Sequence, residues 1–217
     1  DRSADILATT GVHIGGTDCD RLLDLATVMP LLGYRHIGTG RRPVPNSVFF
    51  DLSTWHLIHQ AYTRKALHFA KELWTDYVDQ TLHARLMDVL EGQHGHRMLS
   101  GVEAAKIACS VTGDDALVDL DFLGHGGSEH LGATVTASTM TDTLQQAINQ
   151  IVQCAQQCVQ RSGLASVDTI YLTGGSSALR PLVEALRTAM PEATLVEGNR
   201  FGGVAAGLGY AGATLPV

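Results

Sequence analysis

The chain has 217 residues, of which 45% are hydrophobic and 17% are charged, and its formal net charge is −7. This composition excludes a disordered chain and low-complexity repeats, and the length suffices for one domain with a substantial core or for two small lobes. The acidic balance argues against a general attraction to nucleic acid or to anionic membranes. No apolar run approaches the ~18 uncharged residues that a transmembrane helix requires.

The four cysteines, Cys19, Cys109, Cys154 and Cys158, are too few and too scattered for a disulfide framework. The first five residues, Asp-Arg-Ser-Ala-Asp, do not have the features of a signal peptide. Together these observations predict a reducing, cytoplasmic compartment.

Ten histidines raise the question of a metal site, but their spacing does not support one. His94 and His96 stand two apart, and His125 and His130 flank a pair of glycines. No cysteine or histidine pair follows at zinc-finger spacing, and the sequence holds no His-Glu-x-x-His. We therefore expect no metal site, and we expect the histidines to serve surface and packing roles.

The chain is predicted to begin with a strand and a helix. Residues 6–9 are apolar between polar neighbours, which predicts a short strand. A glycine-rich turn then leads into a capped helix over 17–26, which is expected to end before Gly33. Residues 35–46 are basic and contain several glycines and prolines, so they are predicted to form a loop.

Two helical stretches are predicted next. From a cap at Ser53 or Thr54, apolar residues recur at roughly helical spacing as far as Gly92, which predicts one long helical stretch. Residues 100–103, Ser-Gly-Val-Glu, are typical of an N-terminal cap and predict a third helix running to about Val111.

The hydrophobic period then changes. Residues 116–123 alternate between apolar and polar side chains and predict a strand, with residues 131–136 as its partner. The helical period returns from about residue 140 to Arg161. Residues 169–172 are predicted to form a buried strand. The last predicted elements are a helix, a short strand and a small-residue helix, over 182–190, 195–196 and 202–208.

This order predicts an α/β fold with a helix-rich insertion before the last hundred residues. The most informative segment is the strand that ends in Gly174 and Gly175 and enters a helix. Such a turn presents free backbone N–H groups at a helix N-terminus, and glycine lets a flat ring or a phosphate approach the backbone closely. Alone the signal is weak, because most Gly-Gly turns only connect a strand with a helix.

Three segments that occur in a fixed order make ligand binding at this turn a stronger prediction. Residues 15–20 read Gly-Gly-Thr-Asp-Cys-Asp, residues 102–110 read Val-Glu-Ala-Ala-Lys-Ile-Ala-Cys-Ser, and residues 170–176 read Ile-Tyr-Leu-Thr-Gly-Gly-Ser. With them the chain resembles the nucleotide-binding domain of DnaK-type heat-shock chaperones (the heat shock protein 70 family), within the actin-like ATPase superfamily. The runs at 29–33 and 201–208 resemble its YegD-like branch in particular, and the resemblance covers essentially the whole chain.

The resemblance implies the second lobe of an actin-like (ribonuclease H-like) ATPase domain with an inserted α+β lobe. Residues 1–14 and 139–217 would form the base lobe, and residues 15–138 would form the insertion. It also implies that ATP or ADP, with Mg²⁺ in an intact parent, is the cofactor. The residues implied to contact the nucleotide are Gly16, Glu103, Lys106, Ser110, Gly174, Gly175 and Ser176.

These residues have separate implied roles. Glu103 and Lys106 lie three apart on one helix face; Glu103 would accept hydrogen bonds from the ribose hydroxyls, and Lys106 would cover the nucleoside. Ser110 would reach the adenine edge. The Gly-Gly turn would lie against the base and the sugar, and Gly16 would lie near the phosphates.

The sequence departs from the family pattern at three positions. Ala178 stands where such chaperones usually carry a basic residue, Ile107 replaces a common arginine, and Phe201 stands where an acid is usual. The family's phosphate-binding motifs, Asp-x-Gly-Thr and Asp-x-Gly-Gly-Gly-Thr, do not occur in the sequence. We therefore expect weakened nucleotide binding, no catalytic residue, and no ATP hydrolysis by this chain alone.

The implied partners are the first lobe of the same ATPase domain, unfolded client proteins and co-chaperones, with no nucleic acid and no membrane. With the first lobe absent, the strand at 6–8 would form a sheet edge, so the chain is expected to self-associate. Two other functions fit the Gly-Gly turn: a sugar or acyl kinase of the actin superfamily, or a non-catalytic actin-like filament or interaction module. An acceptor-sugar contact set would favour the first, and polymerisation would favour the second.

Overall fold

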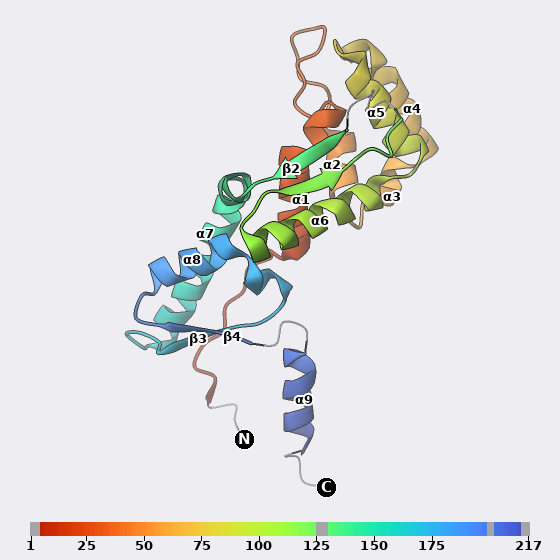
Figure 1. Cartoon of the computed structure of the whole chain (residues 1–217). Coiled ribbons are helices and arrows are strands. Elements are labelled where there is room, and N and C mark those ends of the chain that lie inside the picture. The colour runs from red at the N-terminus through yellow and green to blue at the C-terminus, as the bar shows by residue number, and fades with distance from the viewer. Residues whose placement is uncertain (1–4, 125–129, 199–201, 214–217) are drawn as a thin grey trace. The chain divides into compact units, whose positions relative to one another are not determined.

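The computed structural model describes residues 5–124, 130–198 and 202–213. The chain divides into two compact units (Figure 1). The base unit comprises residues 1–16 and 145–217, and the helical unit comprises residues 17–144. The division predicted from the sequence lies at 14/15 and 138/139.

The helical unit begins with α1 (Gly16–Thr27), which confirms the helix predicted over 17–26. The short 3₁₀ helix η2 (Met29–Leu32), which was not predicted, follows it. Gly33 ends η2 with a φ of +105°, a conformation that favours glycine. A side chain at this position would also collide with the ring of Tyr77, whose hydroxyl donates to the carbonyl of Leu32 at 2.8 Å. The loop that follows is thereby held against the later part of the unit.

The predicted single long helical stretch is wrong. Ser53 is the last residue of a short helix, and the stretch divides further because two side chains cap new helices within it. Thr63 accepts from the backbone N–H of Ala66, and Asp79 accepts from that of Thr81. The elements are α2 (Ser47–Ser53), α3 (Ile58–Ala61), α4 (Arg64–Glu72), η3 (Leu73–Asp76) and α5 (Gln80–Glu91).

Helix α6 (Gly95–Thr112) begins five residues before the predicted cap at Ser100, so Ser100 lies inside the helix. The hydroxyl of Tyr62 accepts from the backbone N–H of Gly95 at 2.8 Å, and it lies so close that a Cβ at this position would clash. The start of α6 is therefore determined by a contact with a residue 33 positions earlier. Gly113, with a φ of +81°, ends the helix close to the predicted position.

A β-hairpin packs against α6. Strands β1 (Ala116–Asp119) and β2 (Gly132–Val135) pair antiparallel, as predicted, although β1 is shorter than the predicted 116–123. Residues 125–129 of the predicted turn lie outside the described residues.

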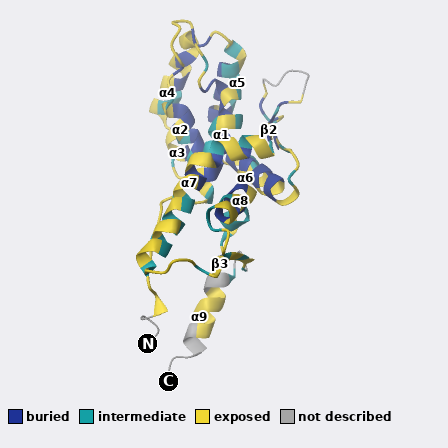
Figure 2. Cartoon of the chain, turned by 90° about the vertical axis from the view of Figure 1, so that its left-hand side faces the viewer, coloured by how far each residue is buried: buried dark blue, intermediate teal, exposed yellow. Residues whose placement is uncertain are grey.

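Most of the described core belongs to the helical unit, where Figure 2 shows buried residues on many helices. Each fully buried Leu, Phe or Met side chain contributes about 1.5–3 kcal/mol relative to its exposed state. The largest of these buried side chains include Leu23, Phe49, Leu52, Tyr77, Leu86, Leu90 and Met98.

The base unit contains two parallel strands and the helices around them. Strands β3 (Thr169–Leu172) and β4 (Thr194–Glu197) pair in parallel and are connected through η4 (Gly175–Ala178) and α8 (Arg180–Ala189). Helix α7 (Ala137–Ser162) precedes them, and α9 (Gly203–Ala213) follows. The prediction that β3 is buried is wrong, because only Leu172 is buried and Tyr171 is 61% exposed.

The predicted strand over 6–9 is also wrong. These residues form no strand in the described part of the chain, and Ile6 is 66% exposed. The segment lies instead along α7: the thiol of Cys158 donates to the carbonyl of Ala8, and the hydroxyl of Thr10 donates to the carbonyl of Cys154 at 3.0 Å. A strand requires a neighbouring ladder, and no described strand provides one here.

We expect the chain to self-associate through the β3–β4 pair. Within the described residues each of these strands has one neighbour, whereas parallel sheets are normally covered on both faces. The sedimentation coefficient should therefore rise with protein concentration, and Tyr171→Lys should reduce this rise. Ile107→Lys, at a helical position that is 52% exposed, is the control. A chain that stays monomeric at every concentration would contradict the expectation.

Candidate functional site

A buried ion pair joins two of the three sequence segments that carry the resemblance. Nζ of Lys106 on α6 lies 2.7 Å from Oδ1 of Asp20 on α1, and the two side chains are only 9% and 6% exposed. Both residues belong to the helical unit. The segments at 15–20 and 102–110, far apart in the sequence, therefore meet at this pair.

The side-chain pattern of α6 places Lys106 on the buried face of the helix. Val102, Ala105 and Cys109 are buried on the same side, whereas Glu103 and Ile107 are exposed. The aliphatic stem of a lysine packs readily among apolar neighbours, but its ammonium group then needs a partner. Asp20 supplies the opposite charge.

The acids of α1 have unusual titration properties because they are buried. Burial raises the pKa of the Asp20 carboxyl, and the hydrogen bond from Lys106 opposes this shift. Asp24, one helical turn later, is fully buried, and burial together with the charge of Asp20 holds the pKa of its carboxyl well above the ordinary value. Neither carboxyl oxygen of Asp24 has a hydrogen-bond partner among the described residues. Burial also raises the pKa of the neighbouring Cys19 thiol, which favours the unreactive neutral form.

Glu103 and Ser110 occupy different environments on α6. Glu103 is exposed, and its charge is close enough to raise the pKa of Asp20, so it lies at the solvent side of the ion pair. Ser110 is buried, and its hydroxyl donates to Sδ of Met140 at 3.6 Å. Within the helical unit, Glu103 is therefore the predicted contact residue that is open to a ligand.

The Gly-Gly-Ser turn lies in the base unit, between β3 and η4. Gly174 has a φ of +89°, and the hydroxyl of Ser177 donates to its carbonyl at 2.6 Å, which closes the turn. Among the described residues, no atom outside each glycine and its two chain neighbours lies within 4 Å of the Cβ positions of Gly174 and Gly175, and Ser176 is partly exposed. The backbone of the turn is thus accessible to a flat ligand.

The predicted residues thus fall into separate groups. Lys106 and Glu103 come together in the helical unit, whereas Gly174 to Ser176 belong to the base unit. Gly16 is the first residue of α1 and lies at the boundary between the units. That residues of both units clamp one nucleoside stays a prediction.

Asp20 is a site residue that sequence reasoning missed. The sequence places it only in the segment 15–20 at the start of the first predicted helix, with no role of its own. The available signal was its position on the apolar face of α1, next to Cys19 and one turn before Asp24. A lysine on the buried side of another helix was the matching signal, but no local pattern connects the two.

Two of the cavities among the described residues are formed by residues outside the predicted nucleotide site. One of about 480 Å³ lies in the helical unit and is lined by residues that include Asp51, Gln60 and Phe69. One of about 360 Å³ lies in the base unit, where Val159 and Met190 contribute to its wall. Neither includes a residue of the predicted nucleotide site.

No protein-family model matches the chain. Among the described residues, no helix combines the length and the apolar character that crossing a membrane would require.

We expect Lys106→Met to destabilise the helical unit by about 3 kcal/mol or more, because it leaves the Asp20 carboxyl buried without a partner. Glu103→Gln, an exposed change on the same helix, should stay within about 0.5 kcal/mol of the parent chain. The chain's two tryptophans, Trp55 and Trp74, both lie in this unit, so their fluorescence during urea unfolding reports its stability. Equal losses in the two variants would contradict a structural role for the ion pair.

Asp24→Asn should reduce the fall in stability that accompanies rising pH. Because burial raises the folded-state pKa of Asp24 above 3.8, the folded chain keeps a proton that the unfolded chain releases above about pH 4. The contribution of this group to stability is thus fully present at lower pH and is lost as the pH rises towards the folded-state pKa. Asparagine does not titrate in this range.

This effect is measured by urea unfolding at about pH 5 and about pH 8. Asp142→Asn, which changes an exposed aspartate of α7, is the control and should keep the pH dependence of the parent chain. The same pH dependence in all three proteins would show that Asp24 titrates normally.

Proposed function

We propose that the chain is the C-terminal half of the ATP-binding domain of a heat-shock-type molecular chaperone and supplies the adenosine side of its nucleotide cleft. The observation that supports this most directly is the buried pair of Lys106 and Asp20. It brings together two of the three segments on which the resemblance rests, and it leaves Glu103 exposed beside them. A surface Glu–Lys pair of a helix would not need a buried partner on another helix.

In this proposal the residues have distinct roles. Glu103 accepts hydrogen bonds from the ribose hydroxyls, because its carboxylate is exposed next to the site. Asp20 is a positioning residue, since it holds the ammonium group of Lys106 in place from the buried side. The resemblance implies that Lys106 covers the nucleoside, but its side chain is only 9% exposed and pairs with Asp20. In this proposal Lys106 therefore positions α6 and does not contact the nucleoside directly.

The turn of the base unit fits the other side of a nucleoside. Its two glycines are open, so a base or a sugar could lie directly on the backbone. The exposed Ile107 and the partly exposed Ala178 stand where the resemblance implies cationic side chains. They offer apolar contact without a cation–π interaction, which favours modest affinity.

Phosphoryl chemistry belongs to another part of the proposed parent protein. Mg²⁺ and charged groups around the γ-phosphate carry out such chemistry, and the sequence contains neither phosphate-binding motif. The proposed partners are accordingly the first lobe of the ATPase domain and, for the parent, client proteins and co-chaperones in the cytoplasm.

Glu103→Ala should weaken binding of ADP by about 1–2 kcal/mol, the usual contribution of a charge-assisted hydrogen bond. Calorimetric titration of the chain, and of a longer protein that includes the first lobe, measures this change. Glu91→Ala, at an exposed glutamate of the same unit that pairs with Lys71, is the matched control. Unchanged affinity in Glu103→Ala would remove the residue from the site.

The chain alone should not release phosphate from ATP at the rate of an ordinary ATPase. The reason is that its sequence lacks the motifs that hold the phosphates. A phosphate-release assay with Mg²⁺ checks this expectation. Magnesium-dependent turnover that depends on an added sugar or acyl acceptor would instead favour a kinase of the same superfamily.

A further inference from the structure

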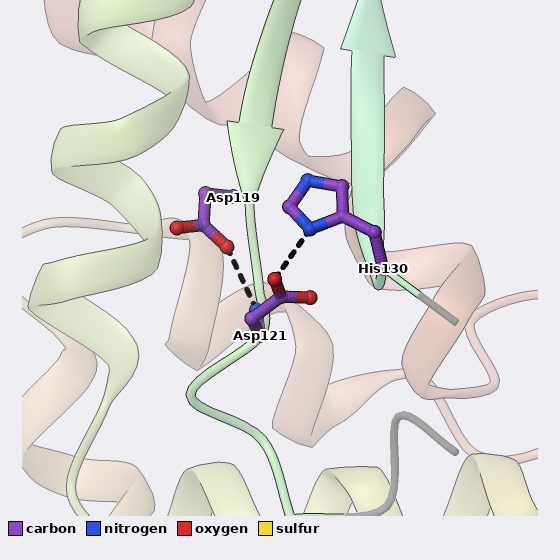
Figure 3. A group of neighbouring side chains, drawn as sticks. All are labelled: Asp119, Asp121 and His130. Carbon is purple, nitrogen blue, oxygen red and sulfur yellow. Dashed lines mark hydrogen bonds and ion pairs between the residues drawn. The ribbon is translucent and has the colours of Figure 1, made fainter. Parts of the chain in front are cut away.

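Three side chains with metal-binding groups meet at the loop end of the β1–β2 hairpin (Figure 3). Asp119 is the last residue of β1, Asp121 follows two residues later, and His130 stands two residues before β2. One potential ligand atom from each residue lies within 4.8 Å of the others. All three residues are exposed, so an ion in solution can reach them.

The pairing of the hairpin places these residues together. Asp119 pairs with Gly132, and the backbone N–H of Leu120 donates to the carbonyl of Leu131 at 2.9 Å, so the antiparallel register continues beyond the strands. In this register Asp121 stands opposite His130. Asp119 and Asp121 are two apart and therefore share one face of the extended arm.

Backbone groups orient both carboxylates. Oδ1 of Asp119 accepts from the N–H of Asp121 at 2.8 Å, and Oδ1 of Asp121 accepts from the N–H of Leu131 at 2.6 Å. The other oxygen of Asp121 contacts Nδ1 of His130. Metal-binding carboxylates are commonly oriented by hydrogen bonds of this kind.

The donor set indicates a class of ion. Calcium and magnesium prefer sites made of oxygen ligands only, whereas an imidazole nitrogen combined with carboxylates suits zinc and related divalent transition ions. Zinc–nitrogen and zinc–oxygen bonds are about 2.1 Å long, so small rotations of the exposed side chains would bring all three donors to one ion.

We propose that Asp119, Asp121 and His130 form a binding site for a divalent transition-metal ion of the zinc type, which bridges the two arms of the hairpin. The spacing of cysteines and histidines along the chain predicts no metal site. Here the donors come from two arms that only the β pairing brings together. Three protein ligands leave further coordination positions for water.

The experiment is a calorimetric titration of the metal-free 217-residue chain with zinc chloride, followed by the same titration of two variants. His130→Ala removes the nitrogen donor. Asp119→Asn keeps an oxygen that can accept from the N–H of Asp121 but removes the charge. Each should lower the affinity of one zinc site by about tenfold or more.

The matched control is His68→Ala. His68 is also an exposed histidine of the helical unit within ion-pair distance of a carboxylate, Glu72, at 3.4 Å, but it lies on α4 and away from the hairpin. This variant should keep the zinc affinity of the parent chain. Circular dichroism of each variant checks that the fold is retained.

Cobalt(II) absorption provides a second readout that does not depend on affinity alone. Visible ligand-field bands that appear with the parent chain and with His68→Ala, but not with His130→Ala, would support coordination by the imidazole. Zinc affinity that is the same in His130→Ala as in the parent chain, or no zinc binding by the folded parent chain, would overturn the proposal.

Discussion

The helical unit depends on one electrostatic constraint: an ammonium group inside an apolar interface must have a partner. Lys106 and Asp20 satisfy each other at 2.7 Å, and this requirement determines how α1 and α6 align. Nearby, Asp24 keeps its interior position because burial favours its neutral form. Such a pair contributes little net stability compared with apolar residues of the same size, but it penalises other alignments of the two helices, because they would leave a charge buried alone. The same alignment orients Glu103 towards solvent.

The sequence could predict those elements whose hydrophobic period and end signals agree. Helices α1 and α7, the β1–β2 hairpin, the strand pair β3 and β4, and α9 are of this kind. The prediction of a single long helix failed because the apolar period continues across Thr63 and Asp79. At these two residues the side chains accept hydrogen bonds from backbone N–H groups and so begin new helices. The prediction of a strand over 6–9 failed for a different reason. A β-strand exists only when another strand pairs with it. Apolar residues without such a neighbour remain an exposed segment.

The candidate site was predictable only in part. Motif order identified Glu103, Lys106 and the glycine turn, but it could not show that Lys106 is buried or that Asp20 is its partner. The group formed by Asp119, Asp121 and His130 was not predictable from local spacing, because it depends on the hairpin register. In both cases the missing information is a pairing between residues distant in sequence. A charged residue on an otherwise apolar helix face is the one local signal that such a pairing exists.

The chain passes between its two units twice, and both passages are helical or lead directly into a helix. One passage lies at Gly16, where α1 begins, and the other lies inside α7, a helix of 26 residues. A helix of that length is about 39 Å long and resists bending. The other passage contains the adjacent Gly15 and Gly16, which carry no side chains, and Gly16 is already the first residue of α1. One continuous helix and one glycine pair that leads into a helix are thus the two covalent connections between the units.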